Sequence, residues 1–216
     1  GQKAVIDHLL TMLIAGFETT SASAAWGLMA LARDQEIQTR LRNEIDLHAS
    51  DTKTFLNYVD SNTTDLNKFC VEVFRNFPTI PFILRSIEAS FDIPTRDGPV
   101  SFEKGNYVLL SIEETNQMSV EDPAAFRPFG EAPKTSLTFG GGPRICPGRQ
   151  VAAMEVKIIT ALVLQRFSLK SNQHSVFQAK KNRISAVPSC GANLTVMPLH
   201  TPQATTPPLP QTSLDA

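Results

Sequence analysis

A cysteine at the end of a glycine-rich loop is the residue of this sequence whose type and setting best suit chemistry. Cys146 follows the glycine run 140–142 and precedes Pro147. Because proline fits the first position of a helix, the pattern predicts a helix that begins here with Cys146 as its N-cap. The free amides and the dipole of that helix would stabilise a negative charge on the sulfur. The thiolate is the form of cysteine that binds metals, so the loop predicts a thiolate metal ligand.

Other interpretations of this loop compete with metal binding. A lone cysteine is most often a small buried hydrophobic residue, and a run of glycines is most often only a loop. A phosphate-binding loop is disfavoured, because no Gly-Lys-Ser/Thr follows and the glycine spacing is wrong. The glycines also let the backbone approach a flat or bulky group, and Arg144 adds a cation two residues before the sulfur.

A second polar cluster lies inside the longest stretch of low charge, residues 9–31. The stretch is long enough to cross a bilayer, but a carboxylate such as Glu18 at its centre would cost about 2.5–3.5 kcal/mol. We therefore expect a long helix in the centre of a soluble domain, apolar nearly all round because protein surrounds it. The hydroxyl of Thr19 can bond the carbonyl of Ala15, four residues back, and open the helix locally.

A third motif is a charge pair with helical spacing. Glu72 and Arg75 lie at i and i+3, so they face the same side of a helix and can pair with each other. Such pairs are usually solvated surface contacts, and alone this one would predict only a helix. Pro78, Pro81 and Arg85 follow it in close succession.

Together the three motifs resemble the signatures of the cytochrome P450 family. The family's haem-binding loop is Phe-x-x-Gly-x-Arg-x-Cys-x-Gly, and all its fixed positions match, as Phe139, Gly142, Arg144, Cys146 and Gly148. Residues 15–20 match Ala-Gly-x-Glu/Asp-Thr-Thr/Ser, residues 72–75 match Glu-x-x-Arg, and residues 78–85 match Pro-x-x-Pro-x-x-x-Arg. The motifs also follow in the family's order, at the spacing of a eukaryotic-type member.

The resemblance implies a role for each of these residues. Cys146 would be the axial thiolate on haem iron, and Arg144 and Arg85 would pair with haem propionates. Thr19, assisted by Glu18, would organise proton delivery when O₂ is split. The residues expected to contact the cofactor are Ala15, Gly16, Arg85, Phe139, Gly142, Arg144, Cys146 and Gly148. The expected catalytic residues are Glu18 and Thr19.

The sequence departs from the family pattern in three respects. The family usually has Pro-Glu-Arg-Phe before the haem loop, where its arginine joins the Glu-x-x-Arg pair, and here Arg127 is the candidate substitute. If it cannot act so, a buried charge loses a partner at a cost of several kcal/mol. Asn116-Gln117 stands where His-Arg is common. The helices that precede the central helix in the family, about half of it, are missing, so we expect a fragment.

Several elements must position these motifs. Apolar periodicity and capping residues, with Asp34 and Asp65 as N-caps, predict helices over residues 9–31, 34–48, 65–77 and 147–167. Three β-rich runs, residues 82–87, 91–94 and 107–112, predict a small antiparallel sheet. The polar stretch 49–64 predicts a connection, residues 113–145 a long irregular segment, and residues 186–199 a terminal hairpin. The expected fold class is mainly α with small antiparallel β-sheets (α+β), the C-terminal half of the cytochrome P450 fold.

Composition limits the remaining possibilities. The 216 residues are 42% hydrophobic with a net charge of −1, and no run of like charges offers the basic face that nucleic acid needs. The three cysteines form neither a disulfide framework nor a zinc motif, which favours a reducing compartment. We expect residues 1–199 to be the C-terminal part of a single haem domain and residues 200–216 to be a disordered Pro/Thr-rich tail.

The function implied by the resemblance is a haem-thiolate monooxygenase. It would insert one oxygen atom of O₂ into an apolar small-molecule substrate, with haem b as cofactor. Electrons would come from NADPH through a reductase, or from a ferredoxin. Two alternatives stay open: a haem-thiolate isomerase or dehydratase, against which Glu18 and Thr19 count, and a catalytically silent haem-binding fragment. By analogy with eukaryotic relatives we expect the cytosolic face of the endoplasmic reticulum, through an N-terminal anchor outside this chain, and no transmembrane segment within it.

Overall fold

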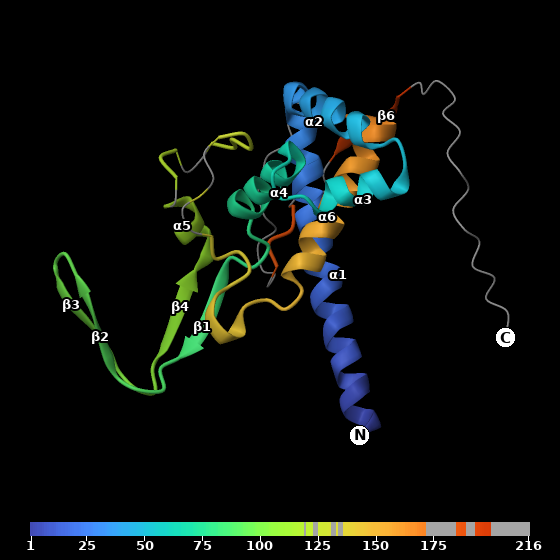
Figure 1. The fold of residues 1–216 in the computed structure, drawn as a ribbon. Coiled ribbons are helices and arrows are strands. Elements are labelled where there is room, and N and C mark those ends of the chain that lie inside the picture. Colours follow the sequence, from blue (N-terminus) through green and yellow to red (C-terminus); the bar gives the residue numbers. More distant parts are fainter. Residues whose placement is uncertain are drawn as a thin grey trace.

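The fold is taken from a computed structural model of the chain, which describes residues 1–118, 120–122, 125–130, 133, 136–171, 185–188 and 193–199. The helices are α1 (Gln2–Arg33), α2 (Gln35–His48), α3 (Thr52–Asp60), α4 (Asp65–Asn76), α5 (Ile112–Gln117), the short 3₁₀ helix η1 (Gly142–Arg144) and α6 (Arg149–Arg166). The strands are β1 (Phe82–Ser86), β2 (Phe91–Thr95), β3 (Gly98–Phe102), β4 (Tyr107–Ser111), β5 (Phe167–Ser171) and β6 (Leu194–Pro198). Two-stranded antiparallel sheets flank a helical body (Figure 1), which confirms the predicted fold class.

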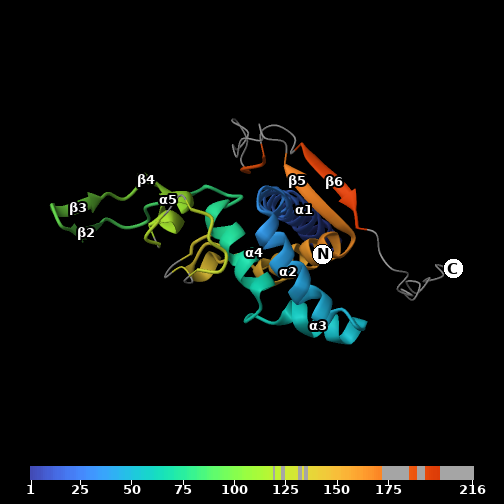
Figure 2. The ribbon, with the colours of Figure 1, turned by 90° about the horizontal axis from the view of Figure 1, so that it is seen from above.

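The helical body forms around the second half of α1. Helices α2, α4 and α6 and strand β5 pack against α1, and Figure 2 shows α1 nearly end-on among them. The buried residues of α1 all lie between Thr20 and Ala32. Leu41 and Ile45, two of the apolar positions that predicted the second helix, are fully buried. Because each such side chain stabilises the fold by about 1.5–3 kcal/mol, this stripe anchors α2 to the core.

The first half of α1 differs from the prediction. Residues 1–18 are exposed, and Leu13, Ile14 and Phe17 leave 66%, 70% and 74% of their surface open. The expectation of a helix surrounded by protein along its length is therefore wrong, because little of the described chain covers this half, which extends below the body in Figure 1. No helix of the described residues combines the length and the mean hydropathy that crossing a membrane requires.

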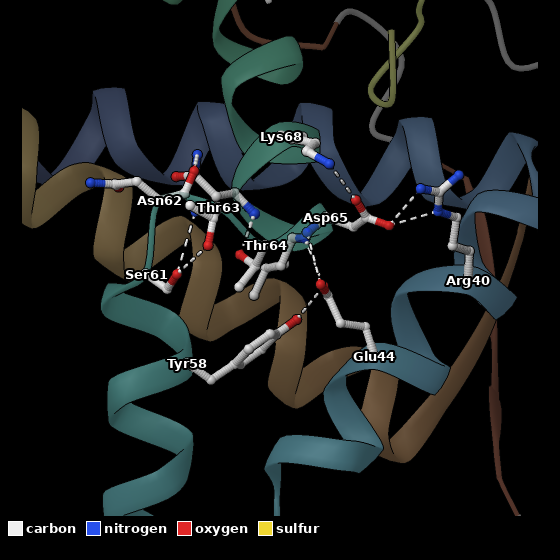
Figure 3. A network of polar contacts seen from close by, with 11 residues as sticks. Arg40, Glu44, Tyr58, Ser61, Asn62, Thr63, Thr64, Asp65 and Lys68 are labelled. Carbon is white, nitrogen blue, oxygen red and sulfur yellow. Dashed lines mark hydrogen bonds and ion pairs between the residues drawn. The ribbon is translucent and has the colours of Figure 1, made fainter.

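A polar junction joins α2, α3 and α4 (Figure 3). The carboxylate of Glu44 on α2 accepts hydrogen bonds from the backbone N–H groups of Asp65 (2.9 Å) and Leu66 (3.0 Å). It also accepts one from the hydroxyl of Tyr58 on α3, at 2.8 Å. A helix start leaves its first amides without partners, so Glu44 completes the first turn of α4 from another helix.

The capping residues agree with the sequence in part. Asp34 caps α2 as predicted, accepting hydrogen bonds from two backbone amides. The N-cap of α4 is Thr64, so the prediction of Asp65 is wrong by one residue; Asp65 instead pairs with Arg40 and Lys68. Helix α3, capped by Asp51, lies within residues 49–64, which we expected to be a connection. Its nine residues bury only two side chains, which is too short a pattern for periodicity to detect.

The strands are arranged differently from the single sheet expected. β1 pairs with β4 and β2 pairs with β3, as separate antiparallel ladders. β6 pairs with β5, whose residues 167–171 lie outside the segment 186–199, so the predicted terminal hairpin over that segment is wrong in its partner. Sequence patterns identify strands, but a partner so far away in the chain leaves no local signal. Helix α5 interrupts the segment 113–145 that was expected to be irregular. Residues 200–216 lie outside the described residues, so their disorder stays a prediction.

Candidate functional site

The loop that carries Cys146 is closed by its own backbone. The N–H of Cys146 donates to the carbonyl of Phe139 at 2.8 Å, and the N–H of Ile145 donates to the carbonyl of Gly142 at 3.1 Å. Gly140 and Gly142 have φ angles of 73° and 65°. Side chains rarely adopt this left-handed region, so both positions require glycine for the loop to fold back on itself. The result holds Cys146, half-buried, between η1 and α6.

The predicted capping role of Cys146 is wrong. Helix α6 begins at Arg149 with Gly148 as its N-cap, so Cys146 lies two residues before the N-cap and three before the first helical residue. The amide of Cys146 is also not free, because it bonds Phe139. A Cβ on Gly148 would lie 3.9 Å from the Cys146 sulfur, in ordinary van der Waals contact, so this glycine leaves the space next to the sulfur unfilled.

The polar cluster of α1 lies at the boundary between its exposed and buried halves. The hydroxyl of Thr19 donates to the carbonyl of Ala15 at 2.7 Å, which confirms the predicted contact. The helix nevertheless stays regular through this turn, so the expected local opening is not seen. Glu18 accepts a hydrogen bond from the hydroxyl of Ser185. At Gly16 an added Cβ would meet nothing within 4 Å.

The Glu72–Arg75 pair is buried, unlike most pairs of this spacing. Nε and Nη2 of Arg75 each donate to a different oxygen of Glu72, both at 2.7 Å. The side chains are 1% and 8% exposed for Arg75 and Glu72. Nη2 of Arg75 also donates to the carbonyl of Ala125 at 3.0 Å. A buried pair with this two-pronged geometry holds the segment before the Cys146 loop against α4.

The side chain of Arg127 does not join this pair. Its guanidinium bonds the exposed carboxylate of Asp122 at 2.8 Å. The backbone N–H of Arg127 instead donates to Glu72 at 2.9 Å. The guanidinium of Arg127, the candidate substitute, therefore does not replace the family's arginine, and a main-chain amide supplies the third contact of the pair.

The remaining predicted cofactor residues lie around the loop and on β1. Arg144 ends η1 and is exposed, as is Arg85, whose guanidinium donates to the carbonyl of Leu84 at 2.9 Å. The ring of Phe139 packs edge-on against Phe74, with centroids 5.2 Å apart. Sequence reasoning missed Asn116 as a member of this region. The residue stood out only as a departure from a family pattern, and nothing in the sequence indicated that it would be fully buried.

The two described cysteines differ in their environment. Cys70 is 1% exposed, and burial raises its pKa to about 12, although the positive charge of the nearby Lys157 acts in the opposite direction. At pH 8 such a thiol is ionised in about one molecule in ten thousand. Cys146 is half-buried and lies in a loop.

We expect a maleimide at pH 8 to label Cys146 and to spare Cys70 in the native, cofactor-free chain, because the thiolate is the reactive form. Mass spectrometry of the digested protein measures each site separately. Denaturant should abolish the difference. Equal labelling of both cysteines without denaturant would contradict the burial of Cys70.

The residues present fit an iron porphyrin. Cys146 offers one sulfur ligand, and no group of three or more His, Cys, Asp or Glu among the described residues could hold a metal ion. A single thiolate suits an iron that a porphyrin already holds. A Cβ added at Gly16 or at Gly142 would have no atom within 4 Å, so a flat group has room to approach the backbone at both glycines. Arg144 and Arg85 offer exposed cations for its carboxylates.

Comparisons with known proteins agree with this geometry. The family model described as Cytochrome P450 matches residues 2–195. Cytochrome P450 4A11 of Homo sapiens is 36% identical over 169 residues, which cover 74% of this chain and 32% of that protein. Cytochrome P450 72A552 of Barbarea vulgaris is 29% identical over 211 residues, which cover 91% of this chain and 39% of that protein.

The fold comparison gives the same result. The crystal structure of the cytochrome P450DA heme domain superposes with a TM-score of 0.75 at 26% identity, over 88% of this chain and 43% of that one. This chain therefore spans less than half the length of each of these relatives. On its motifs, its fold and the extent of the family match, the chain belongs to the cytochrome P450 family.

Proposed function

We propose that this protein, loaded with haem b, is a monooxygenase that inserts one oxygen atom of O₂ into an apolar organic substrate. The observation that carries the proposal is the closed loop that presents Cys146 next to Gly148, with every fixed position of the family's haem-binding motif in place. The family as a whole supports haem-thiolate oxidation chemistry. The particular reaction and substrate belong to the proposal.

In this proposal the protein holds haem through a small set of residues. Cys146 binds the iron, and the positive charges of Arg144 and Arg85 balance the propionates. Gly142 and Gly148, on either side of Cys146 in the chain, and Ala15 and Gly16 on α1 would leave room for a flat group to approach the backbone. The ring of Phe139, within the loop, packs edge-on against Phe74 and would form part of an apolar wall near the sulfur. When bound, haem supplies the redox-active iron at which O₂ is activated.

Glu18 and Thr19 would handle protons. The Thr19 hydroxyl donates to the carbonyl of Ala15. By rotating away from this carbonyl, it would instead donate to an oxygen atom in the site. Glu18, the preceding residue, accepts a hydrogen bond from the hydroxyl of Ser185, and it would pass protons between the surface and Thr19. This pairing is the feature that favours oxygen insertion over isomerase or dehydratase chemistry, which needs no proton delivery to O₂.

Electrons would come from NADPH through a reductase, or from a ferredoxin, and the proposed location is the cytosolic face of the endoplasmic reticulum. To test this function, a haem-loaded sample is supplied with electrons, ¹⁸O₂ and a fatty-chain compound that stands in for the unidentified substrate. We expect one labelled oxygen atom per product molecule. Product formed without O₂ uptake would instead establish the isomerase or dehydratase alternative, and a thiolate-ligated haem without any product would establish the silent fragment.

The role of Thr19 gives a separate prediction. Thr19→Ala should keep the haem but lower the product formed per electron pair about tenfold or more, with the electrons recovered as hydrogen peroxide, because general-acid assistance is lost. Product and peroxide are measured together against electron consumption.

The chain offers a matched control on the same helix. Thr11 makes the same hydroxyl bond to the carbonyl four residues back, at 2.7 Å, on the exposed part of α1. Thr11→Ala should therefore change helix stability as Thr19→Ala does and leave coupling intact. If Thr19→Ala forms as much product per electron pair as the unmodified protein, Thr19 has no role in proton delivery.

A further inference from the structure

A buried asparagine connects the Glu72–Arg75 helix to the segment that enters the Cys146 loop. Asn116 on α5 is 0% exposed. Its Nδ2 donates to the carbonyl of Arg75 at 3.3 Å and to the hydroxyl of Thr138 at 2.8 Å. Its Oδ1 accepts the backbone N–H of Leu137 at 2.8 Å. Both ends of one amide side chain therefore hold the same short segment.

Thr138 extends this contact to the end of α4. Its hydroxyl donates to the carbonyl of Phe74 at 2.8 Å. The carbonyls of Phe74 and Arg75 belong to the last turn of α4, where a helix has no backbone donors left. Asn116 and Thr138 thus satisfy two such carbonyls and fix residues 137 and 138 to the helix that carries the buried ion pair.

The same segment sets the backbone that receives Cys146. The N–H of Gly140 donates to the carbonyl of Leu137, and the N–H of Cys146 donates to the carbonyl of Phe139, both at 2.8 Å. The Phe139 ring lies against Phe74. A shift of Leu137 would therefore move the acceptor that holds Cys146. Helices α4 and α5 pack together, and in Figure 1 the loop that precedes α6 passes beside them.

We propose that Asn116 is a positioning residue for the Cys146 sulfur. It clamps the entry of the loop to the C-terminal end of α4 and so transmits the rigidity of the Glu72–Arg75 pair to the thiolate. The part of this inference that concerns haem rests on the proposed function, whereas the clamp itself is a property of the polypeptide.

A second buried amide provides a matched control. Gln38 is 1% exposed, its Nε2 donates to the carbonyls of Leu31 and Leu169, and its Oε1 accepts the N–H of Leu169. Asn116→Ala and Gln38→Ala therefore remove the same kind of group from the core, at different places. A purely structural role predicts the same pattern of changes at the loop for both.

The first test is hydrogen exchange in the full 216-residue chain without cofactor. Asn116→Ala should speed exchange of the Leu137, Gly140 and Cys146 amides at least about tenfold more than that of the core of α6. Gln38→Ala should speed exchange of Leu169 and leave those three amides at the rate of the α6 core. Equal effects of both variants on the loop would overturn the clamp.

If Asn116→Ala does not fold, Thr138→Val and Thr138→Ser replace it. Valine keeps the volume of threonine and loses the hydroxyl that bridges Asn116 and Phe74, whereas serine restores the hydroxyl. We expect faster loop exchange in the valine variant and recovery in the serine variant. If only the volume of the side chain at position 138 mattered, the serine variant would not recover slow loop exchange.

The second test is the reduction potential and the carbon monoxide spectrum of haem-loaded protein. Asn116→Ala and Thr138→Val should shift the potential and convert part of the thiolate-type spectrum to the form without thiolate, and Gln38→Ala should not. If Asn116→Ala and Thr138→Val speed loop exchange but every variant has a normal spectrum, the clamp stands and only its effect on the sulfur is overturned. Absence of a thiolate spectrum in the unmodified protein would refute the proposed function and leave the exchange result to decide on the clamp.

Discussion

Replacing Cys146 by alanine is expected to abolish the thiolate-type spectrum of the haem-loaded, reduced, carbon monoxide-bound protein completely. Alanine has no atom that can bind iron, and no second described cysteine lies in the loop. The fold itself should change little. The backbone bond from residue 146 to Phe139 does not use the side chain, so it survives the substitution. Absorption spectra measure the first effect, and denaturant unfolding of the cofactor-free chain measures the second.

Cys70→Ala is the control for this experiment. It removes a sulfur from the fully buried core, where burial raises the thiol pKa to about 12. It should cost about 1–3 kcal/mol of stability through the cavity it leaves and keep the thiolate-type spectrum. Cys146→Ala should show the reverse pattern. A thiolate-type spectrum that persists in Cys146→Ala would exclude this sulfur as the ligand.

The site could be predicted from the sequence as far as its chemistry is local. The motif around Cys146 and the bond from Thr19 to Ala15 depend on residues within a few positions of one another. The helix start after Cys146 was placed two residues too early, because proline at a helix start is a statistical preference and the competing bond to Phe139 is a feature of the folded loop. Asn116 could not be found in this way, since its partners lie 21, 22 and 41 positions away.

The fold shows the same division. Apolar spacing predicted α2 and α4 within a few residues, and β1, β2 and β4 were recognised by composition. Burial was predicted throughout residues 9–31, because a stretch of low charge indicates that a partner exists without saying which segment supplies it. The pairing of β6 with β5 failed for the same reason. Long-range contacts follow from the balance of many packing terms, which no single window of sequence contains.

The second large effect is expected at the buried ion pair. Arg75→Ala should lower the free energy of unfolding by about 3–5 kcal/mol, because it leaves the carboxylate of Glu72 buried with its charge unpaired. Among the described residues, Glu72 keeps the backbone N–H of Arg127 as a donor after this change. A neutral amide cannot balance a full negative charge in a site where the side chain is 8% exposed. Denaturant unfolding of the 216-residue chain gives the measurement, with the loaded protein as a second sample.

Arg127→Ala separates the two ways in which position 127 could support this pair. The guanidinium of Arg127 bonds Asp122 where both side chains are largely open to water, at 66% and 48% exposure. Its removal should therefore cost only about 0–1 kcal/mol, and the backbone N–H that donates to Glu72 is kept. A loss as large as that of Arg75→Ala would mean that the Arg127 side chain carries part of the charge balance after all. The combined variant distinguishes the cases further, since independent sites give additive losses and a shared carboxylate partner does not.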